Sequence, residues 1–463
     1  MSSFFLFDVN ESLNIFLLWK IIGGKMKKIL IFVLLLCVSL SWASEQTRDK
    51  TMLKITGFTE DSNLQKAGAK VGDFILKYNG TIVHKISTLS KLKEQVNSSQ
   101  IHITILREVI VQVLVVPKGQ LGAYLKEVQQ DHPIDQDAVI IDGIGKLGWK
   151  QGMENSFHGC VTLLEEKYGD KTSYADILGL SGYVFRTHFF DRWCPSSPDA
   201  TVGYNTGEKV LNLLGYKYNV YHSSNENEQS MEKGLTTQEM TEEIKKGIDN
   251  GYPVIAIDLI EVPEWGLITG YQKNGKELFC RTYFDKTDGY EIAQKKPWAI
   301  FVLEGKKKAQ FKKSYKKSLQ NAKELYTSKK YDNYFSGIKA TEEWIAALED
   351  KIYFKDIEPD KFAEMKLANW WTYYSLMGAR AIGALYLKNN AERFEMKVDK
   401  IEELEIIYKQ ESEFLMEYFN EIPSPHNGFD KRQWNHEERL KQAEILKEFL
   451  NFEKEVKQLL DEL

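Results

Sequence analysis

Cysteine is scarce in this chain, with four among 463 residues, and three of them (Cys160, Cys194 and Cys280) lie beyond residue 43. An odd number of cysteines leaves at least one thiol free or bonded to another molecule, which excludes a disulfide framework as the main stabiliser. Histidine is also rare, with eight residues, and no Cys/His cluster has the spacing of zinc ligands. We therefore predict no metal site and no cofactor.

Long runs of positive charge are absent as well. The net charge is −5, and the only basic block, at residues 306–308, continues into a segment where lysines alternate with apolar residues. That pattern is typical of a solvated helix face. These features argue against a nucleic-acid partner.

The one strongly apolar run, residues 29–36, is too short for a transmembrane span. It follows the basic Met26-Lys27-Lys28 and precedes Ser41-Trp42-Ala43, a small-x-small cleavage site ahead of Ser44. We predict a signal peptide over residues 26–43, with residues 1–25 as an upstream extension. Cys37 follows Leu36, which departs from the lipoprotein pattern. The expected product is exported, periplasmic or extracellular, and has no stable membrane span after signal cleavage.

The length predicts two to four domains. We divide the chain into residues 50–127, residues 137–304 and residues 306–463, with a multidomain α+β fold class. The first block is expected to be a β-barrel or sandwich, the second a mixed α+β unit, and the third an all-α bundle.

The first block contains a short helix and a strand joined by glycine-rich turns, over residues 62–80. Ala67 and Gly68 close the helix, since glycine readily adopts the left-handed cap. Asn79-Gly80 is typical of the primed turn of a β-hairpin.

This segment resembles bacterial PDZ domains of the kind attached to secreted proteases. The resemblance extends to a Gly-Leu-Gly-Phe-like loop at the end of the block, which suggests a circularly permuted strand order. It implies that loop amides and the following strand edge bind the C-terminus or an extended segment of a protein or peptide partner. The alternative is a simple interdomain linker. The expected binding residues are Gly119, Gln120, Leu121, Gly122, Ala123 and Tyr124.

In the second block, apolar residues at helical spacing over residues 157–168 predict a helix that ends at Gly169. Asn155 and Ser156 are good N-caps. Four strand-like runs follow at residues 254–260, 265–271, 278–284 and 298–303. A helix followed by an antiparallel sheet is the element order of a papain-like fold.

Several motifs in this block resemble the N-terminal domain of butirosin biosynthesis protein H, a relative of the double-glycine cysteine peptidases. Similar helical tails follow that domain in relatives, so blocks two and three are expected to form one unit. The motifs are Ser156-Phe157-His158-Gly159-Cys160, Gly182-Tyr183-Val184-Phe185-Arg186, Trp193-Cys194-Pro195-Ser196-Ser197, Leu213 with Gly215-Tyr216, and Trp265-Gly266-Leu267-Ile268-Thr269-Gly270-Tyr271.

The resemblance implies a nucleophilic cysteine at the start of the helix, a histidine base on a central strand and an Asp or Asn on the next strand. In this sequence the first two positions fall on Ser156 and Glu264, and the third falls on Asp285, at the end of the third strand-like run. A serine without a histidine base is a weak nucleophile, so a degenerate catalytic site is expected.

Cys160 offers another reading of the site, as a nucleophile with His158, His188 or His222 as base. It could equally be a buried apolar residue on the apolar face of the helix predicted over residues 157–168, or form a disulfide with Cys194. Cys194 could itself be reactive. Arg186 and Asp199 could line a polar cleft or pair with each other.

The third block has apolar residues at helical spacing and predicts five or six helices. Its aromatic pairs, Trp370-Trp371 and Tyr373-Tyr374, could form a sugar or lipid platform, although a bundle core explains them as well. Two functions compete: an exported peptide-binding protein, or an exported cysteine-dependent peptidase or acyltransferase that uses Cys160. A weaker third possibility is an assembly factor.

Overall fold

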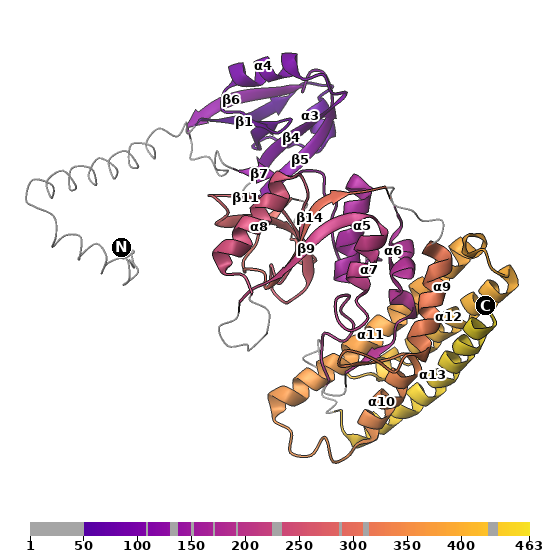
Figure 1. Cartoon of the computed structure of the whole chain (residues 1–463). Helices are drawn as coiled ribbons and strands as arrows, with labels where there is room; N and C mark the ends of the chain where they lie inside the picture. Colours follow the sequence, from indigo (N-terminus) through magenta and orange to yellow (C-terminus); the bar gives the residue numbers. More distant parts are fainter. Residues whose placement is uncertain are drawn as a thin grey trace, which may run out of the picture.

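The computed structural model describes residues 51–463 except 108–109, 130–137, 150–151, 170–171, 191–192, 225–233, 287–288, 309–313 and 425–433. The expected upstream extension and signal peptide, residues 1–25 and 26–43, lie outside the described residues. The chain is a mixed α+β protein with antiparallel sheets and a helical C-terminal region (Figure 1). None of the helices in the described part is both long and apolar enough to cross a membrane.

The N-terminal unit, residues 51–129, is built on a sheet with the order β5-β4-β2-β1-β6, and β3 pairs with β2. Its elements are β1 (Thr51–Phe58), α3 (Asn63–Lys66), β2 (Phe74–Tyr78), β3 (Thr81–Ile82), α4 (Ile86–Gln95), β4 (Gln100–Arg107), β5 (Ile110–Pro117) and β6 (Ala123–Gln129).

Local sequence signals fix the turns of this unit. Asn79 (φ 48°) and Gly80 (φ 85°) both adopt left-handed backbone between the paired residues Tyr78 and Thr81. The predicted primed hairpin turn is therefore confirmed. Gly68 is also left-handed, with a φ of 101°, at the end of the short helix α3.

The central unit, residues 138–308, holds a second sheet with the order β13-β12-β11-β10-β14-β9, and β7 pairs with β11. Its elements are β7 (Val139–Ile140), α5 (Ser156–Tyr168), α6 (Tyr174–Ser181), η1 (Tyr183–Phe185), β8 (His188–Phe189), α7 (Thr206–Leu213), β9 (Tyr216–His222), α8 (Thr237–Asp249), β10 (Val254–Ile257), β11 (Trp265–Gln272), β12 (Glu277–Arg281), β13 (Glu291–Ile292) and β14 (Ala299–Lys306).

Both faces of this sheet are buried. Along β10, Val254 and Ala256 belong to the apolar cluster that contains α8, whereas Ile255 and Ile257 belong to the cluster that contains α5. This alternation follows from the two-residue period of a strand. It places α5, with the candidate residues Ser156 and Cys160, on one face of the sheet.

Two strands are shorter than the sequence predicted. β10 ends at Ile257, and the following Asp258 (φ 68°) and Glu261 (φ 53°) are left-handed, which breaks the extended backbone. β12 ends at Arg281. The expectation that Asp285 lies at the end of that strand is therefore wrong, because Asp285 lies in the loop beyond it.

The C-terminal unit contains five α-helices among the residues described, but it is not wholly helical as expected. A β-hairpin of β15 and β16 pairs with β8 of the central unit, so the two units share a three-stranded sheet. Its elements are α9 (Ser314–Thr327), β15 (Lys330–Tyr331), β16 (Tyr334–Ser336), α10 (Gly337–Glu349), α11 (Pro359–Asn390), η3 (Ala391–Phe394), α12 (Val398–Glu417), η4 (Phe419–Glu421) and α13 (His436–Glu462).

A buried charge cluster ties α11, α12 and α13 to the central unit. Arg380, Glu411 and Glu453 are each fully buried, and the Arg380 guanidinium lies 2.8 Å from a carboxyl oxygen of Glu411 and 2.5 Å from one of Glu453. The Arg380 guanidinium also donates to the main-chain oxygen of Val184 in η1 at 2.7 Å. One apolar cluster continues across both units.

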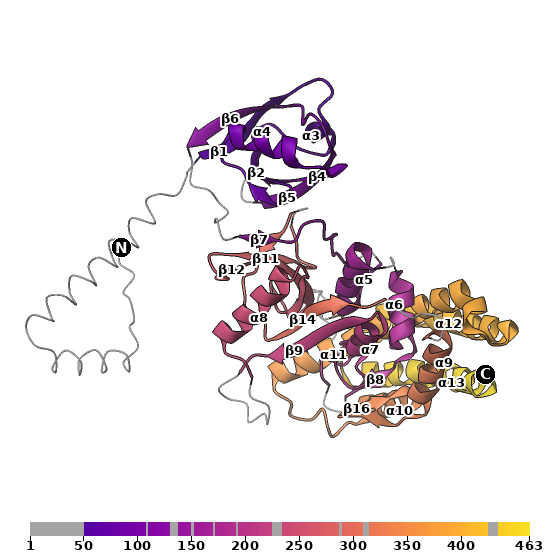
Figure 2. The same cartoon turned by 45° about the horizontal axis from the view of Figure 1, so that its top comes forward.

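The N-terminal unit contacts the central unit near β7 and β11, as both views show (Figures 1 and 2). Lys77 Nζ donates to the Ala138 oxygen at 2.9 Å, and His102 Nδ1 lies 2.7 Å from Asp142 Oδ2. The Tyr290 amide donates to the Val111 oxygen at 3.1 Å. These polar contacts link β2, β4 and β5 to the central unit, and Val128 near the end of β6 packs against the apolar cluster that the two units share.

Candidate functional site

The first candidate site lies along β6, at one end of the N-terminal sheet. β6 pairs with β1 over the register from Thr51↔Gln129 to Phe58↔Ala123, and no other described strand pairs with it. Its second edge is therefore a row of backbone groups outside the described ladder. Helix α4 lies beside this strand, and the Ile86 amide at the start of α4 donates to Glu127 Oε1 at 2.9 Å (Figure 2).

The loop before β6 is held by its carbonyl groups. The Leu121 oxygen accepts from the Leu64 amide (3.0 Å) and from Ser62 Oγ (3.1 Å), and the Gly122 oxygen accepts from the Thr59 amide (2.9 Å). Within the described part of the chain, nothing accepts a hydrogen bond from the amides of residues 119–122. Consecutive unpaired amides of this kind can bind an anion.

Side chains of this loop divide between core and solvent. Leu121 is 5% exposed and packs in the core of the N-terminal unit, whereas Gly119, Gln120 and Tyr124 are exposed. Gly122 has a φ of +71°, and a Cβ there would lie 2.6 Å from Ser62 Cα. Glycine at position 122 is therefore required by both conformation and space.

The second candidate site lies at the start of α5. Asn155 caps this helix through its side chain. The Ser156 Oγ accepts a hydrogen bond from the Trp265 amide at 3.3 Å and also hydrogen-bonds the Glu264 carboxyl. Burial raises the pKa of Glu264 to about 7, Ser156 opposes the shift, and the negative charge of Asp199 adds to it. Ser156 and Glu264, which the sequence analysis matched to the expected nucleophile and base positions, are thus in contact.

Cys160 lies one helical turn further along α5 and is fully buried in the apolar core. Burial raises the pKa of its thiol well above the usual value, and the charge of Glu264 adds to the rise. A thiol with these properties is mostly protonated at neutral pH and is a poor nucleophile. Its placement favours the buried-hydrophobe interpretation.

His158 is also fully buried, with Nδ1 2.6 Å from Asn155 Oδ1. Burial lowers its pKa to about 3, and the positive charge of Arg186 contributes. No described contact joins it to Cys160. The three cysteines that the structure describes are all free, so the alternative of a disulfide between Cys160 and Cys194 is wrong.

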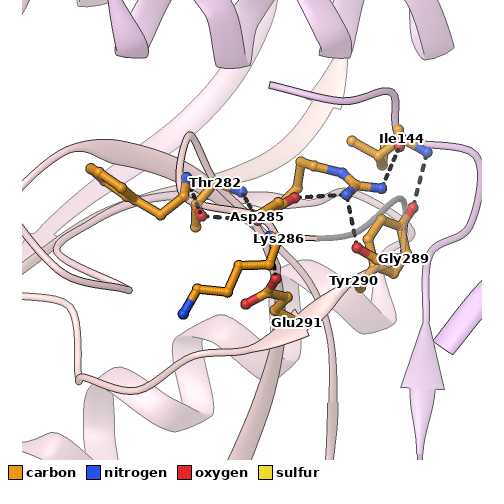
Figure 3. A network of polar contacts seen from close by, with 9 residues as sticks. Ile144, Thr282, Asp285, Lys286, Gly289, Tyr290 and Glu291 are labelled. Carbon is orange, nitrogen blue, oxygen red and sulfur yellow. Dashed lines mark hydrogen bonds and ion pairs between the residues drawn. The ribbon is translucent and has the colours of Figure 1, made fainter. Parts of the chain in front are cut away.

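Asp285 belongs to a separate polar network (Figure 3). Its carboxylate accepts from Arg281 at 2.7 Å and from the amide and hydroxyl of Thr282, both at 2.9 Å. Arg281 also donates to the main-chain oxygens of Gly289 (2.9 Å) and Ile144 (3.5 Å). Asp285 therefore organises the loop after β12, and no contact in the described part of the chain joins it to Glu264 or Ser156.

Two neighbours of the Ser156–Glu264 pair were not expected beside it: the sequence offered Asp199 as a cleft residue or a partner of Arg186, and Trp265 only as part of a motif. The Trp265 indole Nε1 donates to Asp199 Oδ2 at 2.7 Å, which brings Asp199 close to Glu264. Trp265 directly follows Glu264 in sequence, and only the fold brings in Asp199. Among the residues that the structure describes, no group of three His, Cys, Asp or Glu side chains has a metal-binding arrangement.

No protein-family model matches this chain, and no curated protein does so either. The chemistry of both candidate sites must therefore be argued from their own geometry.

Proposed function

We propose that this protein binds the carboxy-terminal end, or an extended segment, of another polypeptide along the open edge of β6, as the resemblance to bacterial PDZ domains implies. The observation that carries this proposal is the edge position of β6 directly after a loop whose amides, at residues 119–122, donate to no described acceptor. Unpaired amides stabilise a terminal carboxylate, and an open strand edge accepts an added strand.

The side chains beside this edge define the ligand class. Leu92 and Val96 of α4, together with Ala123 and Leu125 of β6, are apolar and only partly buried against the core. Their remaining apolar surface would be removed from water by an apolar side chain of the ligand. The proposed ligand therefore ends in a small or medium-sized apolar residue with a free carboxylate.

The test is a fluorescence-anisotropy titration of the full chain with labelled peptides that end in Val, Leu or Ala. Each peptide is matched by the same sequence with a C-terminal amide. Binding of the acids, with at least about tenfold weaker binding of the amides, supports carboxylate recognition, because a hydrogen bond to a charged group contributes about 1.5–3 kcal/mol. Equal affinity for acid and amide would contradict recognition of the chain end.

A pair of variants locates the site. Leu92→Lys places a charge beside β6, whereas Val115→Lys places the same charge on the exposed surface of β5, at the opposite end of the sheet. The first variant should lose binding and the second should retain it. Similar losses in both variants would place the ligand elsewhere.

We also propose that the chain is exported after cleavage before Ser44. The support is the charge and apolar pattern of residues 26–43. N-terminal sequencing of protein recovered from the periplasm or the medium tests this directly. A mature chain that begins upstream of residue 43 would contradict it.

For the central unit we propose a non-catalytic role within a papain-like fold. Cys160 is buried and no described histidine contacts it, which removes the two groups that family chemistry needs. A second candidate function, acyl transfer by Ser156, has one observation in its favour. Glu264 has a pKa of about 7 and hydrogen-bonds the Ser156 hydroxyl, so its carboxylate could accept the serine proton.

A serine-directed fluorophosphonate separates these roles. Covalent labelling of the full chain that is lost in Ser156→Ala, but retained in the control Ser197→Ala, would support acyl transfer. Complete absence of labelling would leave the non-catalytic role as the better account. Ser156 is only 6% exposed, so we expect no labelling.

A further inference from the structure

A small cavity lies where the turn between η1 and β8 faces α11. Its volume is about 20 Å³, enough for about one or two water-sized groups. Its polar lining contains one cation, one imidazole and several hydroxyl groups, and no carboxylate from the described residues. The polar lining residues are Tyr183, Arg186, Thr187, His188, Thr372 and Ser375.

Arg186 brings a positive charge to this cavity while only 5% exposed. The sequence left open whether Arg186 pairs with Asp199 or lines a cleft. Its guanidinium donates to the main-chain oxygens of Asp199 and Pro198, both at 2.8 Å, and to those of Val202 and Tyr204, both at 3.3 Å. Within the described part of the chain it forms no ion pair; carbonyl dipoles and the face of the Tyr183 ring, 4.8 Å from the guanidinium carbon, stabilise its charge, and Asp199 acts on it without direct contact between the two side chains.

The carboxylate of Asp199 is used elsewhere. Oδ2 accepts from the Trp265 indole at 2.7 Å, and Oδ1 accepts from the amide and hydroxyl of Thr201 at 2.8 Å and 2.6 Å. A buried cation without a paired anion is costly. The Arg186 charge therefore favours an anion in the adjacent space.

His188 supplies the second observation. It lines the cavity and is 4% exposed, and neither of its ring nitrogens has a hydrogen-bond partner among the described groups. Its ring stacks on Tyr334 with the centroids 5.9 Å apart. Burial and the Arg186 charge hold the pKa of His188 well below its usual value, so the ring is neutral and keeps one N–H to donate.

Hydroxyl groups complete the lining from two sides. Ser375 of α11 lines the cavity together with Tyr183, whose own hydroxyl donates to the Pro198 oxygen at 3.1 Å. Ser375 is half-buried and is the polar group that α11 contributes next to Tyr183.

We propose that this cavity binds a compact monovalent anion, either a free ion such as chloride or formate, or the carboxylate of a small molecule. Arg186 supplies the charge, and His188 and Ser375 supply hydrogen bonds. The small volume excludes large oxyanions such as citrate. Because the lining comes from the η1–β8 turn and from α11, the anion would join the central and C-terminal units.

The test measures thermal unfolding of the full chain at constant ionic strength while gluconate is replaced by chloride, formate or propionate. A saturable rise in the melting temperature of a few degrees is expected for chloride and formate, since a ligand that binds only the folded state stabilises it. A similar rise with propionate would show that the cavity accepts the carboxylate of a larger molecule. A rise with chloride and formate, but none with propionate, would identify a free ion as the ligand. Equal melting temperatures in all salts would overturn the proposal.

Two variants assign the effect to the cavity. Ser375→Ala should raise the half-saturating anion concentration about tenfold, as expected for one lost hydrogen bond to a charged group. His188→Phe keeps the ring stack on Tyr334 and removes both nitrogens. Thr341→Val, at a buried position on α10 outside the cavity lining, should leave the anion response unchanged. An anion response that survives both cavity variants would contradict the assignment.

Bromide diffraction gives an independent readout. Crystals of the full chain soaked in bromide should show an anomalous peak between Arg186 and His188. Density for water alone at that position would overturn the proposal.

Discussion

The hydroxyl of Ser156 and the carboxyl of Glu264 form a hydrogen bond at the positive end of α5. The resemblance to cysteine peptidases that the sequence suggested would place a thiol and an imidazole at these two positions. Here the pair consists of a serine and a glutamate, and burial raises the pKa of the glutamate carboxyl to about 7. The pair should therefore make the stability of the protein depend on pH, whether or not it catalyses a reaction.

Glu264→Gln should change how stability depends on pH. The folded pKa of about 7 lies above the ordinary glutamate pKa of 4.5, so the folded state holds the proton more tightly than the unfolded state. The contribution of the protonated Glu264 to the free energy of unfolding is fully present below pH 4.5 and is lost as the pH rises to 7. Glutamine removes this loss, so the variant should gain on the order of 3 kcal/mol over the wild type between these limits.

Urea unfolding of both proteins from pH 4.5 to 8.5 measures this difference. Other groups titrate equally in the two proteins, so their difference isolates Glu264. Ser156→Ala is the matched control, because it removes the hydrogen bond and keeps the titrating carboxyl. A constant difference across the range would show that Glu264 does not titrate in this window.

The two buried carboxyls beside Arg380 should respond unequally to substitution. Burial raises the pKa of Glu411 well above its usual value, against the opposing charge of Arg380, and the neighbouring charge of Glu453 contributes to the rise. We therefore predict that Glu411 is the carboxyl of this pair that holds a proton at neutral pH. Glu411→Gln should then cost no more than about 1 kcal/mol. Glu453→Gln leaves the buried Arg380 without an anionic partner and should cost about 3–5 kcal/mol.

The free energy of unfolding at pH 7, from urea titrations of both variants, tests this ranking. Arg380→Met provides the third measurement and should be nearly as destabilising as Glu453→Gln. The interpretation of Glu411 as neutral would be wrong if the two glutamine variants lost equal stability.

Local features of the fold could be predicted from sequence because each depends on few neighbours. The Asn79-Gly80 turn follows from backbone preferences alone. The predicted helix end at Gly169 is also found, although Gly169 is extended (φ −110°, ψ −161°) and the close approach of the Glu165 side chain leaves no room for a Cβ. The end of β12 could not be predicted, because Arg281 donates to Asp285 and to the main-chain oxygens of Gly289 and Ile144, the latter far away in sequence.

The same limit applies to the candidate sites. The sequence matched Ser156 and Glu264 to the expected nucleophile and base positions but did not predict their contact. The burial of Cys160 likewise depends on the packing of α5 against the sheet. The Arg186 cavity combines a turn of the central unit with α11, and no spacing in the sequence indicates that these segments meet.

Thiol labelling should distinguish the three cysteines. Cys160 and Cys280 are fully buried, and burial raises the pKa of both thiols. Cys194 is only half-buried and lies 3.7 Å from the Tyr334 hydroxyl. Iodoacetamide at neutral pH should therefore modify Cys194 first, and the other two only on unfolding.

Peptide mass spectrometry of protein quenched at successive times gives the rate at each thiol. Cys194→Ser should remove the fast phase, and Cys160→Ala should leave it unchanged. A fast phase that disappears in Cys160→Ala would support the alternative function, a cysteine-dependent enzyme that uses Cys160.

Gly122 provides a stability test for the loop before β6. Its φ of +71° is strained for any residue with a Cβ, and an added Cβ would also lie 2.6 Å from Ser62 Cα. Gly80 has a similar φ of +85° with open space around it, so Gly80→Ala pays only the conformational cost, about 1–2 kcal/mol. Gly122→Ala pays the same cost and must also shift the backbone at Ser62, so it should be the more destabilising change. Urea unfolding of the two variants measures the difference, and the peptide titration shows its effect on binding.

Because the Ser62 shift would displace the carbonyl of Leu121, Gly122→Ala should weaken peptide binding while Gly80→Ala leaves it intact. Equal behaviour of the two variants would mean that the loop adapts freely and does not hold its amides in place for a ligand.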